Sequence, residues 1–220
     1  MSFITQFIIN QGIPQETFVL LLMLPIMATV IAFSRQVIGI KGLDIYTPLI
    51  IAFAFLVIGL KSGLIIFITI LLTGTLMRLL VRHFRLLYLP RIAIILTAVI
   101  LAILLLFLAD AYFGQKDLVT ISIFATLIMV TLIERFVSVQ IERRTKKAII
   151  LTTETLLLSI ICYWVANWSW LQNQIINIPL WIVLGTIIIN ILLGRWTSLR
   201  LSEYWRFREV IKHTELPGKK

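Results

Sequence analysis

Residues Ala148–Asn167 read AIILTTETLLLSIICYWVAN, a run of apolar residues with a single charged side chain, Glu154. A helix needs about 20 predominantly apolar residues to cross the hydrocarbon core of a bilayer. The stretch therefore predicts a transmembrane helix. The rest of the chain agrees, because 60% of its 220 residues are hydrophobic and 14% are charged. A soluble domain is about half apolar and about a quarter charged, so the composition indicates an integral membrane protein.

Seven stretches of the chain approach the length of a bilayer span. The second and fifth are the shortest, and at about 1.5 Å of rise per residue each would cover only about 24 Å. We expect an all-α, single-domain bundle of seven transmembrane helices over residues 18–194. An extracytoplasmic segment (1–17) precedes it, and a cytoplasmic tail (195–220) follows it. The seven predicted spans are Phe18–Val37, Ile45–Leu60, Ser62–Val81, Ile92–Asp110, Leu118–Ile133, Ala148–Ala166 and Ile178–Gly194.

The lysines and arginines between the predicted spans fall almost entirely on one side of the membrane. Eighteen of the 20 follow spans one, three, five or seven, and only Lys61 and Lys116 lie on the other side. Cytoplasmic loops carry the excess of Lys and Arg. The sequence therefore predicts a multi-pass protein of the cytoplasmic (inner) membrane, with its N-terminus outside and its C-terminus in the cytoplasm. The same pattern explains the net charge of +10, so we expect no nucleic-acid partner.

A weak internal repeat links two parts of the chain. The pentapeptide AIILT occurs at Ala93–Thr97 and again at Ala148–Thr152. Each copy follows an apolar span with an arginine at its inner end, Arg78 or Arg135, and then a basic loop. Both units enter the membrane from outside and return, so the pattern predicts a parallel repeat of a helix hairpin.

Polar residues within the predicted spans are the first candidate site. Glu154 lies about six residues beyond the inner end of its span, ~9 Å into the membrane, and Asn190 lies at a comparable depth in span seven. Arg78 could reach the same layer, because a long arginine side chain snorkels. One interpretation is an inner-leaflet site, including Thr153, that binds a substrate group or relays protons. The other is an interhelical hydrogen-bond lock.

The segment Gly39–Pro48 also leaves two interpretations open. A non-helical entry into span two would leave backbone groups that need partners, which a membrane tolerates only inside protein or beside water. The segment would then line a cavity. Alternatively it is an ordinary helix start with Asp44 or Thr47 as the cap, and Pro48 in the first turn loses nothing by lacking an N–H.

Two basic regions could contact lipid or a partner protein. The tail Arg195–His213 places apolar and cationic side chains on opposite faces at helical spacing, which predicts an amphipathic helix on the anionic inner leaflet. A docking surface for a cytosolic enzyme is the other interpretation. The basic character of the loop Glu142–Lys147 has two explanations, the topology rule alone or contact with an anionic peptide. The docking candidates are Arg143, Arg144, Lys146, Lys147, Trp205, Arg206, Phe207 and Arg208.

Motifs for autonomous catalysis are missing from the sequence. There is one cysteine, Cys162, and the two histidines are far apart, so no Cys/His metal spacing occurs. The sequence contains no HExxH, GxSxG or GxxxxGK[ST] motif. Span seven has no lysine for a retinal Schiff base. We therefore expect no cofactor, no metal and no enzyme activity of its own.

Two stretches carry a resemblance to known families. Gly42–Ile103, with its Gly-Leu opening, Pro48, two spans, a basic loop and a return span, resembles the membrane subunit CapC/PgsC of poly-gamma-glutamate synthases. Over about Phe33–Ile211, including the WRF at Trp205–Phe207, the chain more closely resembles the seven-helix membrane domain usually fused to an inactive transglutaminase-like domain. Most matched positions are apolar.

The resemblance implies a function beside other proteins. Such membrane domains accompany ATP-grasp peptide ligases of the glutamate-ligase type and peptidase-like partners. The leading hypothesis is a non-catalytic membrane subunit that anchors a cytosolic ATP-dependent peptide ligase or a transglutaminase-like partner and handles its peptide product. We expect that partner on a separate chain. The alternatives are a small transporter or channel with an inner-leaflet polar site, and a structural subunit of a larger membrane complex.

Overall fold

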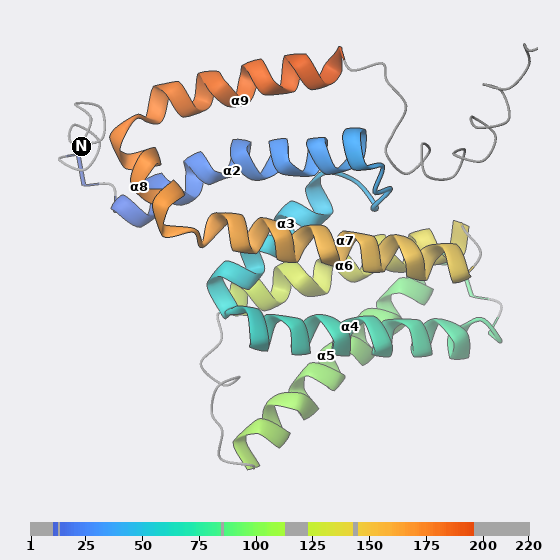
Figure 1. The fold of residues 1–220 in the computed structure, drawn as a ribbon. Helices are drawn as coiled ribbons and strands as arrows, with labels where there is room; N and C mark the ends of the chain where they lie inside the picture. Colours follow the sequence, from blue (N-terminus) through green and yellow to red (C-terminus); the bar gives the residue numbers. More distant parts are fainter. Residues whose placement is uncertain (1–10, 13, 85, 113–122, 143–144, 196–220) are drawn as a thin grey trace, which may run out of the picture. The chain divides into compact units, whose positions relative to one another are not determined.

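The computed structural model describes residues 11–12, 14–84, 86–112, 123–142 and 145–195. Over these ranges the chain is helical between short connections and contains no strand, which confirms the all-α prediction. Figure 1 shows the arrangement of the helices. Their bounds are α2 Gln15–Phe33, the π-helix η1 Ser34–Ile38, α3 Tyr46–Ile58, α4 Leu60–Val81, α5 Tyr88–Tyr112, α6 Ile123–Glu142, α7 Thr145–Ala166, α8 Ser169–Asn177 and α9 Pro179–Gly194.

The helices group into two compact units. Unit 1 comprises the residues up to Leu49 and those from Trp164 onward, and unit 2 comprises Ile50–Tyr163. The division falls inside α3 and inside α7, so each of these two helices contributes residues to both units. The two units are described separately below.

Each of the seven predicted spans overlaps a helix, although the fifth is displaced, with Leu118–Ile133 predicted and α6 at Ile123–Glu142. Among the described residues, four segments are long and apolar enough to cross a bilayer. The pair α8 and α9 meets the same criterion only as one segment with a bend of 109°. The apolar helix α3 covers about 20 Å at 1.5 Å per residue. The four segments are Gln15–Ile38, Leu60–Val81, Tyr88–Tyr112 and Lys147–Ala166.

The helix α8 was not predicted from the sequence. It fills the stretch before the predicted start of span seven, and the chain then turns by 109° into α9. Pro179 occupies the first position of α9, and Ile178 before it has φ −137° and ψ 58°, outside the helical region. A proline disfavours the helical conformation in the residue that precedes it. Pro179 therefore ends α8 and starts α9 in a new direction.

In unit 1, α2 packs against α8 and α9, and Figure 1 shows α2 and α9 side by side. Met23, Met27 and Ile31 on α2 lie one turn apart and have no exposed surface. Lipid tails are as apolar as these side chains, so close packing rather than removal from water stabilises such a contact in a membrane.

The connection from α2 to α3 bears on the two interpretations of Gly39–Pro48. The π-helix η1 is followed by Gly39, which has φ 91°, a backbone conformation that glycine adopts without steric cost. Asp44 Oδ1 then accepts a hydrogen bond of 2.6 Å from the backbone N–H of Thr47. Pro48 lies in the first turn of α3. Asp44 therefore caps the start of α3, and the cavity beside this segment stays a prediction.

In unit 2, α4 packs against α5 and α6. The rings of Phe67 on α4 and Phe136 on α6 meet edge to face, with centroids 5.4 Å apart, a favoured arrangement for aromatic pairs. Gly59 alone joins α3 to α4. Just beyond this corner, Gly63 is buried against the side chain of Phe55. The helices α3 and α4 can approach closely there because residue 63 has no side chain.

Candidate functional site

A chain of hydrogen bonds joins α2 to α9 within unit 1. Pro25 lies inside α2, and the hydroxyl of Thr29, one turn later, donates to the carbonyl of Pro25 over 2.7 Å. Asn190 on α9 donates from Nδ2 to Thr29 Oγ1 over 2.8 Å, and to the carbonyl of Thr186 over 2.8 Å. The Thr29 oxygen thus donates one bond and accepts another, so the side chains of both helices hold each other in place.

A second hydrogen bond ties the same two segments near the end of α9. Gln36 in η1 donates from Nε2 to the carbonyl of Leu193 over 2.5 Å. The last four carbonyls of a helix have no partner within the helix, and Leu193 lies in the last turn of α9. Gln36 therefore donates to a carbonyl in the last turn of α9. We call the Asn190–Thr29 and Gln36–Leu193 contacts the α2–α9 lock.

The lock accounts for one predicted site residue. Asn190 makes an interhelical hydrogen bond, as one interpretation of the sequence held, but its partner is Thr29 rather than a residue of span six. Thr29 and Gln36 were not predicted from the sequence as members of a polar site. Both are uncharged polar residues within a predicted apolar span, and that signal could have singled them out.

We expect Asn190→Ala to lower the free energy of unfolding by about 0.6 kcal/mol, the average for hydrogen bonds between membrane helices. The loss should appear as a shift in the unfolding midpoint of the purified chain in detergent. Asn173→Ala on α8 is the matched control, because Asn173 is exposed. Equal midpoints for the two variants would show that the bond to Thr29 does not stabilise the fold.

The other three predicted residues of the polar site lie in unit 2. Glu154 on α7 and Arg78 on α4 are both half-buried, and Thr153 is exposed. The Thr153 hydroxyl donates to the carbonyl of Ile149 over 3.0 Å. Asn190 lies in unit 1, so the meeting of these four residues stays a prediction.

Hydroxyl groups line the buried face of α7 and bond to their own helix. Thr152, Thr155 and Ser159 are buried, and each donates to the carbonyl one turn earlier over 2.7–2.9 Å. A hydroxyl bonded in this way satisfies its donor without a partner on another helix. Small side chains of this kind let a membrane helix pack closely, so this face has a structural use.

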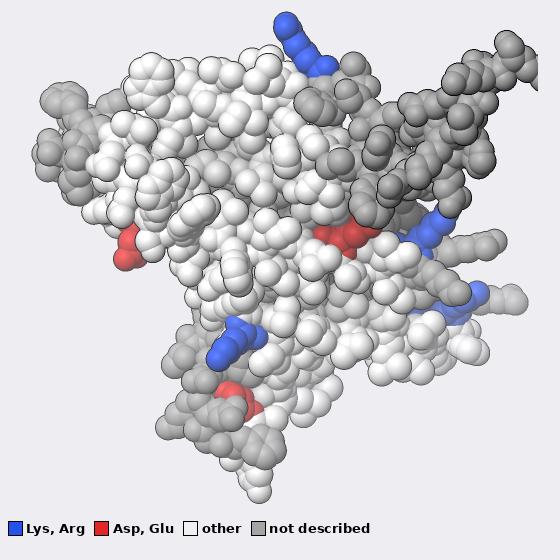
Figure 2. Space-filling model, in the orientation of Figure 1, with Lys and Arg blue, Asp and Glu red and all other residues white. Residues whose placement is uncertain are grey.

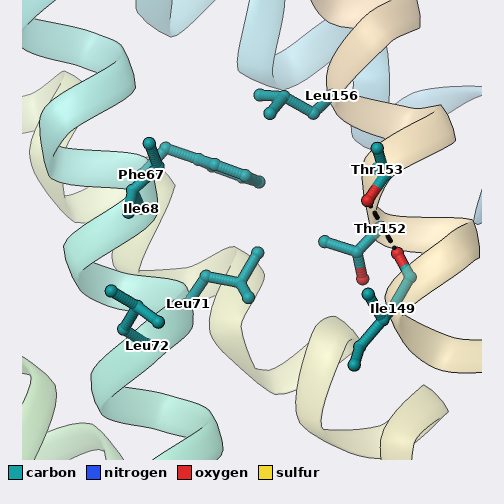
Figure 3. A pocket seen from close by; sticks show the side chains of 8 residues that line it. All are labelled: Phe67, Ile68, Leu71, Leu72, Ile149, Thr152, Thr153 and Leu156. Carbon is teal, nitrogen blue, oxygen red and sulfur yellow. Dashed lines mark hydrogen bonds between the residues drawn. The ribbon is translucent and has the colours of Figure 1, made fainter. Parts of the chain in front are cut away.

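An apolar groove runs between α4 and α7 in unit 2. Its cavity measures about 140 Å³, and Figure 3 shows side chains of both helices pointing toward it. Successive side chains on a helix are about 100° apart, which puts Glu154 on a face of α7 away from this groove. The lining residues are Phe67, Ile68, Leu71 and Leu72 on α4, and Ile149, Thr152, Thr153 and Leu156 on α7.

A comparison with protein families decides what kind of membrane domain this is. The model of the 7TM_transglut family, described as seven transmembrane helices usually fused to an inactive transglutaminase, matches residues 3–211. The chain belongs to this family. The match confirms the second resemblance seen in the sequence, whereas the likeness to CapC/PgsC stays a prediction. No curated protein and no solved structure matches the chain.

Membership of the 7TM_transglut family, together with the apolar helices, places the chain in a membrane. Of the residues predicted to dock lipid or a partner, Lys147 is exposed in the first turn of α7. Lys146 belongs to the same turn, but its side chain lies outside what the structure describes. The remaining candidates lie outside the described residues, namely Arg143, Arg144, Trp205, Arg206, Phe207 and Arg208.

Proposed function

We propose that this 7TM_transglut chain is a non-catalytic membrane subunit that anchors a soluble partner at the cytosolic face of the inner membrane. The partner is a transglutaminase-like protein or an ATP-dependent peptide ligase of the glutamate-ligase type. The family match over residues 3–211 carries the proposal, because the family's membrane domains are usually fused to an inactive transglutaminase. A membrane domain of a family that is usually fused to a soluble domain is suited to anchor a soluble protein at the membrane.

The distribution of charge supports a cytosolic docking face. Figure 1 shows the C-terminal ends of α4 and α6 and the N-terminal end of α7 at the same end of unit 2. Arg82 after α4, Arg135 on α6 and Lys147 on α7 are exposed there. Cationic loops stay on the cytosolic side, which gives the orientation with the N-terminus outside. In this topology the basic residues between α6 and α7 are available to a soluble partner in the cytosol.

We expect the protein, tagged and purified in mild detergent, to bring down a transglutaminase-like or ATP-grasp-like protein. Replacing Arg143, Arg144, Lys146 and Lys147 together by glutamine should reduce the recovered partner by at least about tenfold, since electrostatic attraction of this kind contributes about 1 kcal/mol per charge near a surface. Mass spectrometry of the eluate identifies and quantifies the partner. Lys61→Gln, at the other end of α4, is the control for a change of charge alone. Repeated recovery of the chain without such a protein would count against the proposal.

A transporter or channel is the second candidate, favoured by Glu154 and Arg78 within apolar segments. Ionisable residues in membrane helices commonly mark ion or proton pathways. Glu154→Gln separates the two functions. If the chain is a transporter, the variant should lose solute or proton flux in reconstituted vesicles. If the chain is an anchoring subunit, the variant should recover its soluble partner at the wild-type level.

A further inference from the structure

Three arginines lie close together where α4 turns into α5. The charges of Arg82 and Arg91 both act on Arg78, so these like charges are held near one another in the folded chain. The Nε atom of Arg91 is buried and has no hydrogen-bond partner among the described residues. A buried donor without an acceptor is costly. Among the described residues, none accepts a hydrogen bond from Arg91 Nε, and a bound anion could do so.

The apolar groove leads toward this arginine cluster. Leu71 lines the groove, and Arg78 and Arg82 follow it by seven and eleven residues on α4. At 3.6 residues per turn these spacings put all three side chains on roughly one face of the helix. Arg78 therefore lies about 10 Å along the helix axis from Leu71, and Arg82 about 6 Å farther. One molecule with an apolar chain and an anionic head could occupy both features.

The groove itself is suited to hydrocarbon rather than water. Both of its walls belong to segments long and apolar enough to cross a membrane. Of the described residues that line it, only Thr152 and Thr153 are polar, and both hydroxyls already donate to carbonyls of their own helix. A bound water needs two to four polar partners; these two hydroxyls can still accept bonds, but the other six lining residues are apolar. Lipid tails are the medium available to fill it.

The α4–α5 turn has the character of a membrane interface. Phe84, Leu87 and Leu89 are exposed there, with 65%, 81% and 76% of their surfaces accessible. Tyr88 OH lies 3.0 Å from Ser138 Oγ on α6, which holds the start of α5 against α6. Figure 2 shows Lys and Arg side chains at this end of α4. Apolar and cationic side chains side by side are typical of a segment at the level of the lipid headgroups.

We propose that Arg78, Arg82 and Arg91 bind the phosphate of an anionic phospholipid whose acyl chain lies in the groove between α4 and α7. Basic pockets between membrane helices commonly bind such headgroups. The topology rule explains why arginines occur in this turn. It does not explain why the buried Arg91 Nε has no acceptor among the described residues, whereas a bound phosphate does.

Native mass spectrometry of the purified protein tests the headgroup. Phosphatidylglycerol should be retained at higher occupancy than phosphatidylcholine with the same acyl chains. Arg78→Gln, Arg82→Gln and Arg91→Gln should each weaken binding of phosphatidylglycerol about fivefold. The matched control is Lys61→Gln, at the opposite end of the same helix, which should change it by less than about twofold. Equal retention of the two lipids, or arginine variants that behave like the lysine control, would overturn the proposal.

A separate competition experiment tests whether the acyl chain lies in the groove. Dihexanoyl phosphatidylglycerol and inorganic phosphate share the anionic group but cannot fill the groove, so both should compete weakly with the long-chain lipid. Thr153→Phe adds a ring at an exposed groove position and should weaken only the long-chain lipid. If inorganic phosphate competed as well as the long-chain lipid at the same concentration, the proposal that an acyl chain lies in the groove would be wrong. A lipid-free dimer that dissociates in the Thr153→Phe variant would also contradict the proposal, because a second copy of the chain would then occupy the groove.

Discussion

We expect Gly63→Ala to lower the free energy of unfolding by about 1–3 kcal/mol, the usual effect of overpacking a tight core. A Cβ atom on Gly63 would lie 2.5 Å from Cδ1 and 3.1 Å from Cε1 of Phe55. The Phe55 side chain has no exposed surface, so its ring cannot swing out toward lipid. The corner between α3 and α4 would have to open to admit one methyl group.

Reversible unfolding in mixed micelles, followed by circular dichroism, measures this effect. The matched control is Gly185→Ala on α9, because a Cβ atom there would meet nothing within 4 Å. Alanine is also the better helix former by about 1 kcal/mol, so the control should keep or gain stability. Phe55→Leu in the Gly63→Ala background should recover part of the loss. If Gly63→Ala and Gly185→Ala behaved alike, the close approach of α3 and α4 would be wrong.

Gly59→Ala should destabilise the chain by a comparable amount, about 1–3 kcal/mol, for a different reason. Gly59 has φ 90° and ψ 148°, a region of backbone conformation that L residues rarely adopt. A Cβ atom at this position would meet nothing within 4 Å. The whole effect therefore comes from backbone strain in the one residue that joins α3 to α4.

The same unfolding measurement tests Gly59. Gly194→Ala, at the end of α9, is its control because that glycine also has open space around it and carries no left-handed φ. The control should stay within about 1 kcal/mol of the wild type, the difference in helix propensity between the two residues. A Gly59→Ala variant as stable as Gly194→Ala would show that the corner tolerates another backbone conformation.

The positions of the helices followed from local composition. Apolar runs about as long as a bilayer span are readable residue by residue, and each of the seven predicted runs overlaps a helix. Asp44 at the start of α3 was one of two caps expected from the sequence, since a cap bonds a backbone group only a few residues away. The turn between α8 and α9 also depends on a local residue, Pro179. The sequence placed the start of span seven there but did not predict a helix before it.

The partners of individual side chains could not be read in this way. Asn190 donates a hydrogen bond to Thr29, a residue 161 positions away that was not predicted as its partner; its meeting with Glu154 stays a prediction. Nothing near Asn190 in the sequence points to Thr29, because the contact depends on how α9 lies against α2. The burial of Gly63 against Phe55 likewise depends on the angle at Gly59.

The sequence by itself determined that the chain is a helical membrane protein, where its helices other than α8 lie approximately, and which family it resembles. Those properties depend on transfer of each segment from water to lipid and on hydrogen bonds within a helix, both of which are local. Only the tertiary structure decided which polar groups meet, where the groove lies, and that the charges of Arg82 and Arg91 act on Arg78. Helix association in lipid depends on close packing and a few hydrogen bonds between distant residues, and composition does not specify those.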